Sequence, residues 1–266
     1  MNKIIMLGTG NGITLDLYNT CFLIQNDGGN FLVDTGGSVE IVKRLKQFDI
    51  NPESIKHIFI SHSDSDHILG VFWLFKKMDI SAMHGLIDEK LNIYCNDAVY
   101  EAIKEIAKYV FPSRLMNDIY KITNFIILKD GDTHIINGIS YTFFDTKAKK
   151  TKLFGFEATF DNKKLAFLGD ETLSPDLYDK IREYDYVMHE AFCLDSEEEL
   201  FHANEIHHST VKDVSKVMES LNIKNLILYH TEETHKNRKE LYTKEAQLYF
   251  KGKVIVPDDL ETIMIN

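Results

Sequence analysis

Cysteine is scarce in this sequence, and it contains no long hydrophobic run. The three cysteines, Cys21, Cys95 and Cys193, are odd in number and widely spaced among 266 residues. This pattern argues against a disulfide framework or a zinc ribbon and predicts a reducing, cytoplasmic location. No stretch reaches the roughly 20 apolar residues that cross a bilayer, and the first residues, MNKIIMLGTGNG, lack a signal-peptide cleavage pattern. We therefore expect no membrane association.

Basic charge is also in short supply. Lys and Arg number 30 against 41 Asp and Glu, which gives a net charge of −11. Proteins that grip a nucleic-acid backbone usually present a basic face, because Lys and Arg neutralise the phosphates. The segment TKAKKTK, residues 146–152, is a local basic patch at most. The charge balance favours a small substrate over a long polyanion.

What the sequence does contain is an alternation of strand-like apolar runs and helical patterns. The expected strands cover residues 3–8, 21–25, 30–37, 56–61, 124–128, 133–136, 139–144, 153–160, 165–170, 184–190, 224–230 and 253–257. The expected helices cover residues 39–48, 67–77, 96–111, 175–183, 209–221 and 236–250. Two strand-rich halves, each followed by helices, predict a four-layer α/β/β/α sandwich without a linker.

Polar side chains follow several of these strands directly. The run ISHSDSDHILG, residues 60–70, follows one strand, and Asp34, Asp170 and His230 follow three others. Ligands gather at strand ends in α/β architectures, and a hydrolytic metal site needs imidazoles, carboxylates and an open position for water. Read by itself, SDSD is equally a helix cap or a solvated loop. If the strand ends converge, the candidate metal ligands are His62, Asp64, Asp66, His67, Asp170 and His230.

The run from His62 to His67 resembles the H-x-H-x-D-H signature of the metallo-β-lactamase fold. The other landmarks follow in family order: FLVDTGG with Asp34, LAFLGD with Asp170, and LILYH with His230. Two further segments narrow the resemblance: MHEAF (188–192) is similar to the HEAT segment of ribonuclease Z, and EIHHST (205–210) to its HST segment. The resemblance implies a single hydrolase domain over residues 1–266, with the αββα fold of this superfamily and of its ribonuclease Z-like branch.

The resemblance also implies roles for individual residues. His208 matches the histidine that protonates the leaving oxygen as general acid, and Glu190 matches the carboxylate that orients it. Asp66 is the third predicted catalytic residue, and Asp34 matches a structural aspartate that braces the metal loops. General acid catalysis typically contributes about 10²–10⁴-fold. Without the resemblance, His208 reads as a residue ahead of Ser209 and Thr210, which are good helix-capping types.

Two positions depart from the family pattern, and both belong to the same metal. Asp64 replaces the second signature histidine, and Lys147 lies near the place of a later histidine. In the family, one ion takes those two histidines together with the first signature histidine and the bridging aspartate. That set, the first half-site, is reduced here to His62 and Asp64, with Lys149 and Lys150 close to Lys147 in sequence. The second half-site is complete, with the residues Asp66, His67, Asp170 and His230.

We therefore expect one strongly held ion, zinc or manganese, at the second half-site. A protonated lysine has no lone pair for a metal, so Lys147 is predicted to pair with Asp64 and supply part of the missing charge. Opposite charges about 4 Å apart attract by about 4 kcal/mol at an effective dielectric near 20, before desolvation is subtracted. Alternatively, Asp64 ligates a hard ion such as Mn²⁺ and restores a second metal.

The leading functional prediction is a metal-dependent phosphodiesterase, in which a metal-bound water attacks a small phosphodiester or nucleotide. Ribonuclease Z grips transfer RNA with a long basic arm, whereas the interval 171–207 is short and contains the acidic DSEEELF. A long nucleic acid is therefore not the expected partner, and a homodimer is a further prediction. The alternatives are a thioester, lactone or β-lactam hydrolase, and a catalytically impaired binding or regulatory protein.

Overall fold

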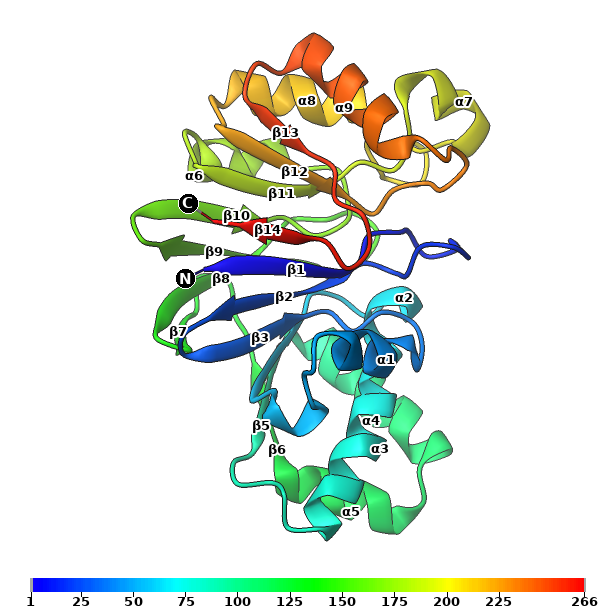
Figure 1. Cartoon of the computed structure of the whole chain (residues 1–266), viewed down its shortest axis with the longest axis vertical. Helices are drawn as coiled ribbons and strands as arrows, with labels where there is room; N and C mark the ends of the chain where they lie inside the picture. The colour runs from blue at the N-terminus through cyan, green and yellow to red at the C-terminus, as the bar shows by residue number, and fades with distance from the viewer. Residues whose placement is uncertain (1, 266) are drawn as a thin grey trace.

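The computed structural model describes residues 2–265 and packs two mixed sheets face to face, with helices on both outer faces (Figure 1). The first sheet has the strand order β14-β1-β2-β3-β4-β5-β6. Its strands are β1 (Lys3–Gly8), β2 (Cys21–Asn26), β3 (Gly29–Val33), β4 (His57–Ile60), β5 (Leu91–Cys95), β6 (Thr123–Ile127) and β14 (Thr262–Met264).

The second sheet has the order β13-β12-β11-β10-β9-β8-β7. Its strands are β7 (Thr133–Ile136), β8 (Ile139–Asp145), β9 (Phe154–Phe160), β10 (Lys163–Phe167), β11 (Tyr186–Glu190), β12 (Asn225–Tyr229) and β13 (Lys253–Ile255). The hairpin predicted from Asn137-Gly138 joins β7 to β8, and both turn residues have positive φ, 49° and 80°. Two consecutive residues with positive φ are typical of the type I′ turn, which matches the twist of the paired strands.

The helices divide between the two outer faces of the sandwich (Figure 1). The α-helices are α1 (Glu40–Gln47), α2 (Ser65–Ile68), α3 (Gly70–Met83), α4 (Asp97–Val110), α5 (Ser113–Ile122), α6 (Tyr178–Ile181), α7 (Glu198–Phe201), α8 (Val211–Ser220) and α9 (Arg238–Tyr249). Short 3-10 turns occupy Pro52–Ser54, Pro175–Leu177 and Asp195–Glu197. Within residues 2–265, every helix is too short or too polar to cross a lipid bilayer.

Three apolar layers separate these four structural layers. Helices α3 to α5 cover the first sheet through residues such as Phe75 and Ile103. Between the sheets lies a buried layer rich in aromatic side chains, among them Phe22, Phe59, Phe156 and Phe167. Helices α8 and α9 cover the second sheet. This arrangement confirms the predicted αββα sandwich.

Several elements differ from the sequence-based prediction. Strands β5 and β14 and helix α5 were not expected, and the expected helix 67–77 is two helices, α2 and α3. Gly70, the first residue of α3, approaches the chain so closely that a Cβ at this position would lie 1.9 Å from the Thr35 carbonyl oxygen. The expected helix 175–183 shrinks to a 3-10 turn and the one-turn α6.

Parallel pairing brings the polar strand ends to one edge. Strand β3 pairs in parallel with β4, and β10, β11 and β12 pair in parallel with one another. Parallel strands place their carboxyl ends on the same edge of a sheet. The segments that follow these strands carry Asp34, the 61–67 run, Asp170 and His230. The fold therefore gathers residues that lie as far as 196 positions apart in sequence.

Candidate metal centre

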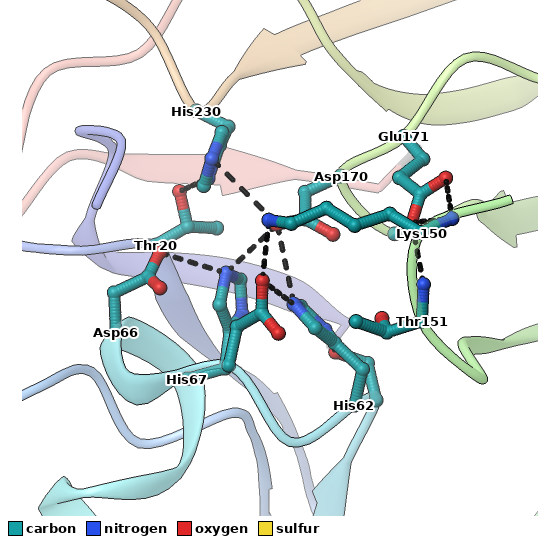
Figure 2. Close-up of polar contacts among 12 residues, drawn as sticks. Thr20, His62, Asp66, His67, Lys150, Thr151, Asp170, Glu171 and His230 are labelled. Carbon is teal, nitrogen blue, oxygen red and sulfur yellow. Dashed lines mark hydrogen bonds and ion pairs between the residues drawn. The ribbon is translucent and has the colours of Figure 1, made fainter. Parts of the chain in front are cut away.

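Four side chains meet at this edge, and they form the second half-site. One ligand atom from each of Asp66, His67, Asp170 and His230 lies within 4.8 Å of all the others. Asp170 is central, because its Oδ2 lies 3.1 Å from Nε2 of His67 and 3.6 Å from Nε2 of His230. Figure 2 shows these side chains converging, with Asp66 and His67 in α2 and Asp170 and His230 in the segments after β10 and β12.

The histidines are held by contacts at Nδ1, which leaves Nε2 directed toward Asp170. Nδ1 of His67 lies 2.8 Å from Oδ2 of Asp34, and Nδ1 of His230 lies 3.3 Å from Oγ1 of Thr20. Asp34 also accepts hydrogen bonds from the backbone N–H and the hydroxyl of Ser61. Contacts of this kind fix the ring orientation of metal-binding histidines. Asp34 thus braces the cluster, as its position in the family pattern implied.

The cluster fits a divalent cation. Among residues 2–265, the buried atoms Nε2 of His67 and Oδ1 of Asp170 have no hydrogen-bond partner. Buried polar atoms are rarely left without one, and these two belong to the converging ligand set. Two imidazoles and two carboxylates suit zinc or manganese.

The electrostatics of the cluster point the same way. Burial alone would lower the pKa of His67, but the carboxylates of Asp66, Asp170 and Asp34 raise it well above its usual value. Burial opposes the charge on Asp170, yet His62 and His67 lower the pKa of Asp170 well below its usual range. Burial lowers the pKa of His230 to about 3, so its ring is neutral at pH 7. A cation would therefore stabilise the buried carboxylates, and the neutral ring of His230 has a lone pair that can bind it.

The first half-site has a different composition. Nε2 of His62 lies 3.4 Å from Oδ2 of Asp170 and 3.9 Å from Oδ2 of Asp64. The ammonium of Lys150 lies 2.6 Å from that same Asp64 oxygen. Burial would lower the pKa of Lys150, but its hydrogen bond and charge attraction to Asp64 raise it overall. A lysine does pair with Asp64, as predicted.

The identity of that lysine was predicted wrongly. Lys147 is exposed, and its Nζ lies 3.2 Å from Oδ2 of Asp145, at the end of β8. Its backbone has a φ of 60° and donates its N–H to the other Asp145 oxygen. This turn carries the Lys147 side chain away from the cluster. The lysine that approaches Asp64 is Lys150, three residues later in the chain.

Glu171 holds the approaching loop, and the sequence analysis missed it. Its carboxylate accepts backbone N–H groups from Lys149, Lys150 and Thr151 at 2.9–3.2 Å. Glu171 is itself only 6% exposed. Figure 2 shows the Lys150 side chain reaching from this loop across the cluster, alongside Asp170. An acidic residue directly after Asp170 was the available signal, but nothing in the sequence located its partners.

The residues predicted for proton transfer lie beside the second half-site. Oε2 of Glu190 is 3.8 Å from Nδ1 of His208, which is beyond hydrogen-bond distance, and neither atom has another partner within residues 2–265. Oε1 of Glu190 accepts the N–H of Ser209. Burial raises the pKa of Glu190 well above its usual value and lowers that of His208. The helix cap is Thr210, which accepts the N–H of Asp213, so capping does not account for His208.

A cleft of about 210 Å³ opens over these groups. Its lining includes Asp64, Asp66, Lys150, Asp170, His208 and His230, together with Asn11, Gly12, Ile13, Phe192 and Ile206. The ring of His208 stacks between Phe192 and His230, with centroid distances of 4.7 and 5.4 Å. The cleft thus combines three of the four candidate metal ligands, Asp66, Asp170 and His230, with a buried histidine and one ammonium.

Comparison with known proteins agrees with this fold. Ribonuclease Z of Methanocaldococcus jannaschii is 26% identical over 316 residues, which covers 99% of this chain and 97% of that protein. The metallo-β-lactamase fold protein YhfI from Bacillus subtilis superimposes with a TM-score of 0.81 at 18% identity, covering 98% of both chains. A diphosphatase of the PhnP family superimposes with a TM-score of 0.77 at 16% identity, covering 100% of this chain and 98% of the other.

A family model described as Anti-Pycsar protein Apyc1 matches residues 2–255, which is almost the whole chain. This match agrees with the fold and with the full-length similarity to ribonuclease Z, and it shows the family of the chain. The chain therefore belongs to the Anti-Pycsar protein Apyc1 family, in the ribonuclease Z-like branch of the metallo-β-lactamase superfamily of metal-dependent hydrolases.

Proposed function

We propose that this hydrolase is a phosphodiesterase acting on a small phosphodiester, such as a cyclic nucleotide or a short oligonucleotide. The observation that carries the proposal is the convergence of the second half-site and His208 on one small cleft. A hydrolase of carboxylic esters or lactones would need the metal ligands but has no evident use for His208 beside Glu190. The relatives named for ribonuclease Z and diphosphatase activity act on phosphate compounds, which supports the same reaction class.

The residues have complementary roles in the proposed reaction. A cation held by Asp66, His67, Asp170 and His230 would lower the pKa of a water molecule and polarise the phosphoryl group. The water oxygen bonds to phosphorus as the bond from phosphorus to the leaving oxygen breaks. Asp66, which lines the cleft, accepts the proton that the water loses. His208 gives its proton to the leaving oxygen.

Glu190 orients His208 in this scheme. A ring shift of under about 1 Å would bring Nδ1 of His208 into hydrogen-bond range of Glu190, and such contacts often tighten only when substrate is bound. Burial disfavours a charge on either group alone. A protonated His208 beside an ionised Glu190 offsets part of both penalties. The pair is therefore suited to hold a proton only while it is close together.

The cleft and its surroundings favour a small substrate. Its volume is about 210 Å³, and the interval 171–207 is filled by short elements, among them α6, β11 and α7. In the part of the chain that the structure describes, this interval forms no extended basic arm. A long RNA would meet an acidic α7 region, with Glu197, Glu198 and Glu199, beside the site.

The test is hydrolysis by protein reconstituted with Zn²⁺ or Mn²⁺. We expect metal-dependent turnover of bis(p-nitrophenyl) phosphate and of at least one 3′,5′-cyclic nucleotide or dinucleotide. Thioester and lactone substrates serve as controls for the superfamily's other chemistry. Turnover of those substrates without any phosphodiester cleavage would refute the proposal.

The reduced first half-site supports one alternative, a non-catalytic binding protein. His62 and Asp64 leave that half-site short of imidazole ligands. The alternative predicts that cyclic nucleotides bind but persist unchanged with every metal supplied. Quantifying the nucleotide by chromatography after prolonged incubation separates binding from slow hydrolysis.

A further inference from the structure

The first half-site contains a fixed ammonium in place of a metal-ligand set. Lys150 Nζ contacts Asp64 at 2.6 Å, and Asp64 lies 3.9 Å from Nε2 of His62. Lys150 lines the same cleft as Asp66 and Asp170, which are two ligands of the other half-site. Its ammonium therefore pairs with Asp64 in a cleft that the carboxylates of Asp66 and Asp170 also line.

The position of Lys150 is built into the fold. The preceding backbone turns at Lys147, and Glu171 then accepts the N–H groups of residues 149, 150 and 151. Glu171 is buried and adjoins the ligand Asp170 in sequence. The residue next to the ligand Asp170 therefore fixes the backbone that carries the Lys150 ammonium. A surface lysine that met Asp64 only incidentally would not need backbone hydrogen bonds of this kind.

The first half-site does not fit a second cation. Its aspartate already accepts a hydrogen bond from Lys150, and an ammonium has no lone pair to offer a metal. A divalent cation bound there would also lie close to that positive charge. The residues present are consistent with one ion at the second half-site and a permanent positive charge at the first.

We propose that Lys150 replaces the second metal ion and binds a non-bridging oxygen of the phosphoryl group that is hydrolysed. This inference rests on the proposed phosphodiesterase function. It assigns recognition of the substrate's anionic phosphoryl group to the Lys150 ammonium. An ammonium has three N–H donors, and one of them is used by Asp64. The side chain is 49% exposed and lines the cleft with His208 and His230, so its remaining donors are accessible from the cleft.

The role is electrostatic and involves no proton transfer by Lys150. Negative charge grows on the non-bridging oxygens as water adds to phosphorus, and fixed donors at these oxygens stabilise that charge. Lys150 stays protonated throughout, while Asp66 takes a proton from the attacking water and His208 gives a proton to the leaving oxygen. Asp64 acts as the positioning residue that keeps the ammonium over the cleft.

The experiment compares Lys150→Gln with the matched control Lys147→Gln. Both remove one positive charge from the same loop, but Lys147 pairs with Asp145 outside the cleft. For each protein we would measure bound metal by elemental analysis, inorganic phosphate affinity of the zinc-loaded form by calorimetry, and kcat/KM. We expect one metal equivalent in all three proteins. Lys150→Gln should bind phosphate about tenfold or more weakly and lose about 10²–10³ in kcat/KM.

A third variant, Lys150→Arg, keeps the cation and should retain phosphate affinity within about threefold. Two tightly bound metal equivalents in the unmodified protein would overturn the proposal, as would equal phosphate affinity for the two glutamine variants. Phosphate binding needs no turnover, so it separates the two claims. If no phosphodiester is cleaved but Lys150→Gln alone loses phosphate affinity, the phosphodiesterase fails and the anion-binding role of Lys150 stands.

Discussion

His208 is the residue at which the proposed chemistry is most directly testable. It lines the cleft beside His230, and no contact within residues 2–265 explains the buried Nδ1 except the approach of Glu190. A general acid matters most when the leaving oxygen is a poor leaving group. Replacing His208 should therefore slow substrates with poor leaving groups more than substrates with good ones, an effect that replacing a packing residue would not produce.

We predict that His208→Ala lowers kcat for a cyclic nucleotide by about 10²–10⁴-fold. Hydrolysis of bis(p-nitrophenyl) phosphate should fall far less, because p-nitrophenolate leaves without a proton. The neighbouring His207→Ala is the control, since His207 lines the adjacent pocket rather than the metal cleft. Equal losses for both substrates would show that His208 only supports the structure.

Asp185 provides a pH-dependent test of stability away from the metal centre. Burial would raise its pKa, but the ion pair with Lys224 and the N–H of Lys164 lower it. Both contacts are 2.9 Å long. A depressed carboxyl pKa contributes stability above the unfolded-state value, about 3.9, and that contribution is lost as the pH falls through the folded-state value.

Asp185→Asn should therefore lower the free energy of unfolding by about 1–2 kcal/mol at pH 7. The difference from the unmodified protein should shrink steadily below about pH 4. Urea unfolding at pH 7 and pH 3.5 measures both values. Asp179→Asn is the matched control, because the Asp179 side chain is 96% exposed and should change stability little. A difference that persists undiminished at low pH contradicts the ionic explanation.

At the scale of elements, the loop 146–152 decides what the first half-site contains. Its backbone is tied to Glu171 by N–H groups of three successive residues. Asn96 adds a second tie, because its amide donates to the carbonyl of Lys152 at 2.8 Å while its oxygen caps α4. The loop thus connects the start of α4 to Glu171, the residue after Asp170.

Glu171→Gln should loosen this loop. A neutral amide accepts more weakly and presents one oxygen, so we expect a cost of about 1–2 kcal/mol, or a 5- to 30-fold larger opened fraction. Limited trypsin digestion should then cleave after Lys149, Lys150 or Lys152 correspondingly faster, as mass spectrometry of early fragments would show. Glu199→Gln, at an exposed position in α7, controls for the charge change. Unchanged cleavage rates would mean that Glu171 does not restrain the loop.

At the scale of the whole molecule, the fold concentrates negative charge that a cation would relieve. Asp34, Asp66 and Asp170 all act on the single imidazole of His67. Binding to the folded state alone stabilises a protein by about 2.7 kcal/mol when free ligand is 100-fold above its dissociation constant. For a chain of this length that corresponds to about 5 °C in Tm.

We accordingly predict that Zn²⁺ or Mn²⁺ raises the Tm by about 5 °C and that a chelator reverses the change. Asp170→Asn should abolish the metal-dependent rise, since the Asp170 carboxylate lies against both histidines of the ligand set. Differential scanning fluorimetry with and without metal measures both. A rise of the same size in Asp170→Asn would indicate metal binding elsewhere.

The predicted homodimer stays a prediction. Helices α4 and α5 leave Tyr109, Val110 and Tyr120 exposed on the outer face of the first sheet. Light scattering at several protein concentrations would give the mass in solution.

Much of this molecule follows from the sequence alone. Apolar runs of strand length, the Asn137-Gly138 turn and the Asn96 cap are local patterns, and the observed strands and helices follow them closely because neighbouring residues determine them. The candidate ligand residues could also be selected from the sequence, since they lie in segments that follow β4, β10 and β12 and the motif fixes their order. Missed elements such as β5 and β14 are short strands whose pairing partners lie far away in sequence.

Tertiary structure alone decided which lysine faces Asp64. Four lysines lie within residues 147–152, and nothing local distinguishes them. The choice of Lys150 depends on the left-handed turn at Lys147 and on Glu171, which binds the loop from 20 to 22 residues away. A side chain's reach is set by backbone geometry and long-range hydrogen bonds, whereas strand and helix formation is set mainly by nearby residues. For this reason the sequence could indicate a positive charge at the first half-site but not the atom that supplies it.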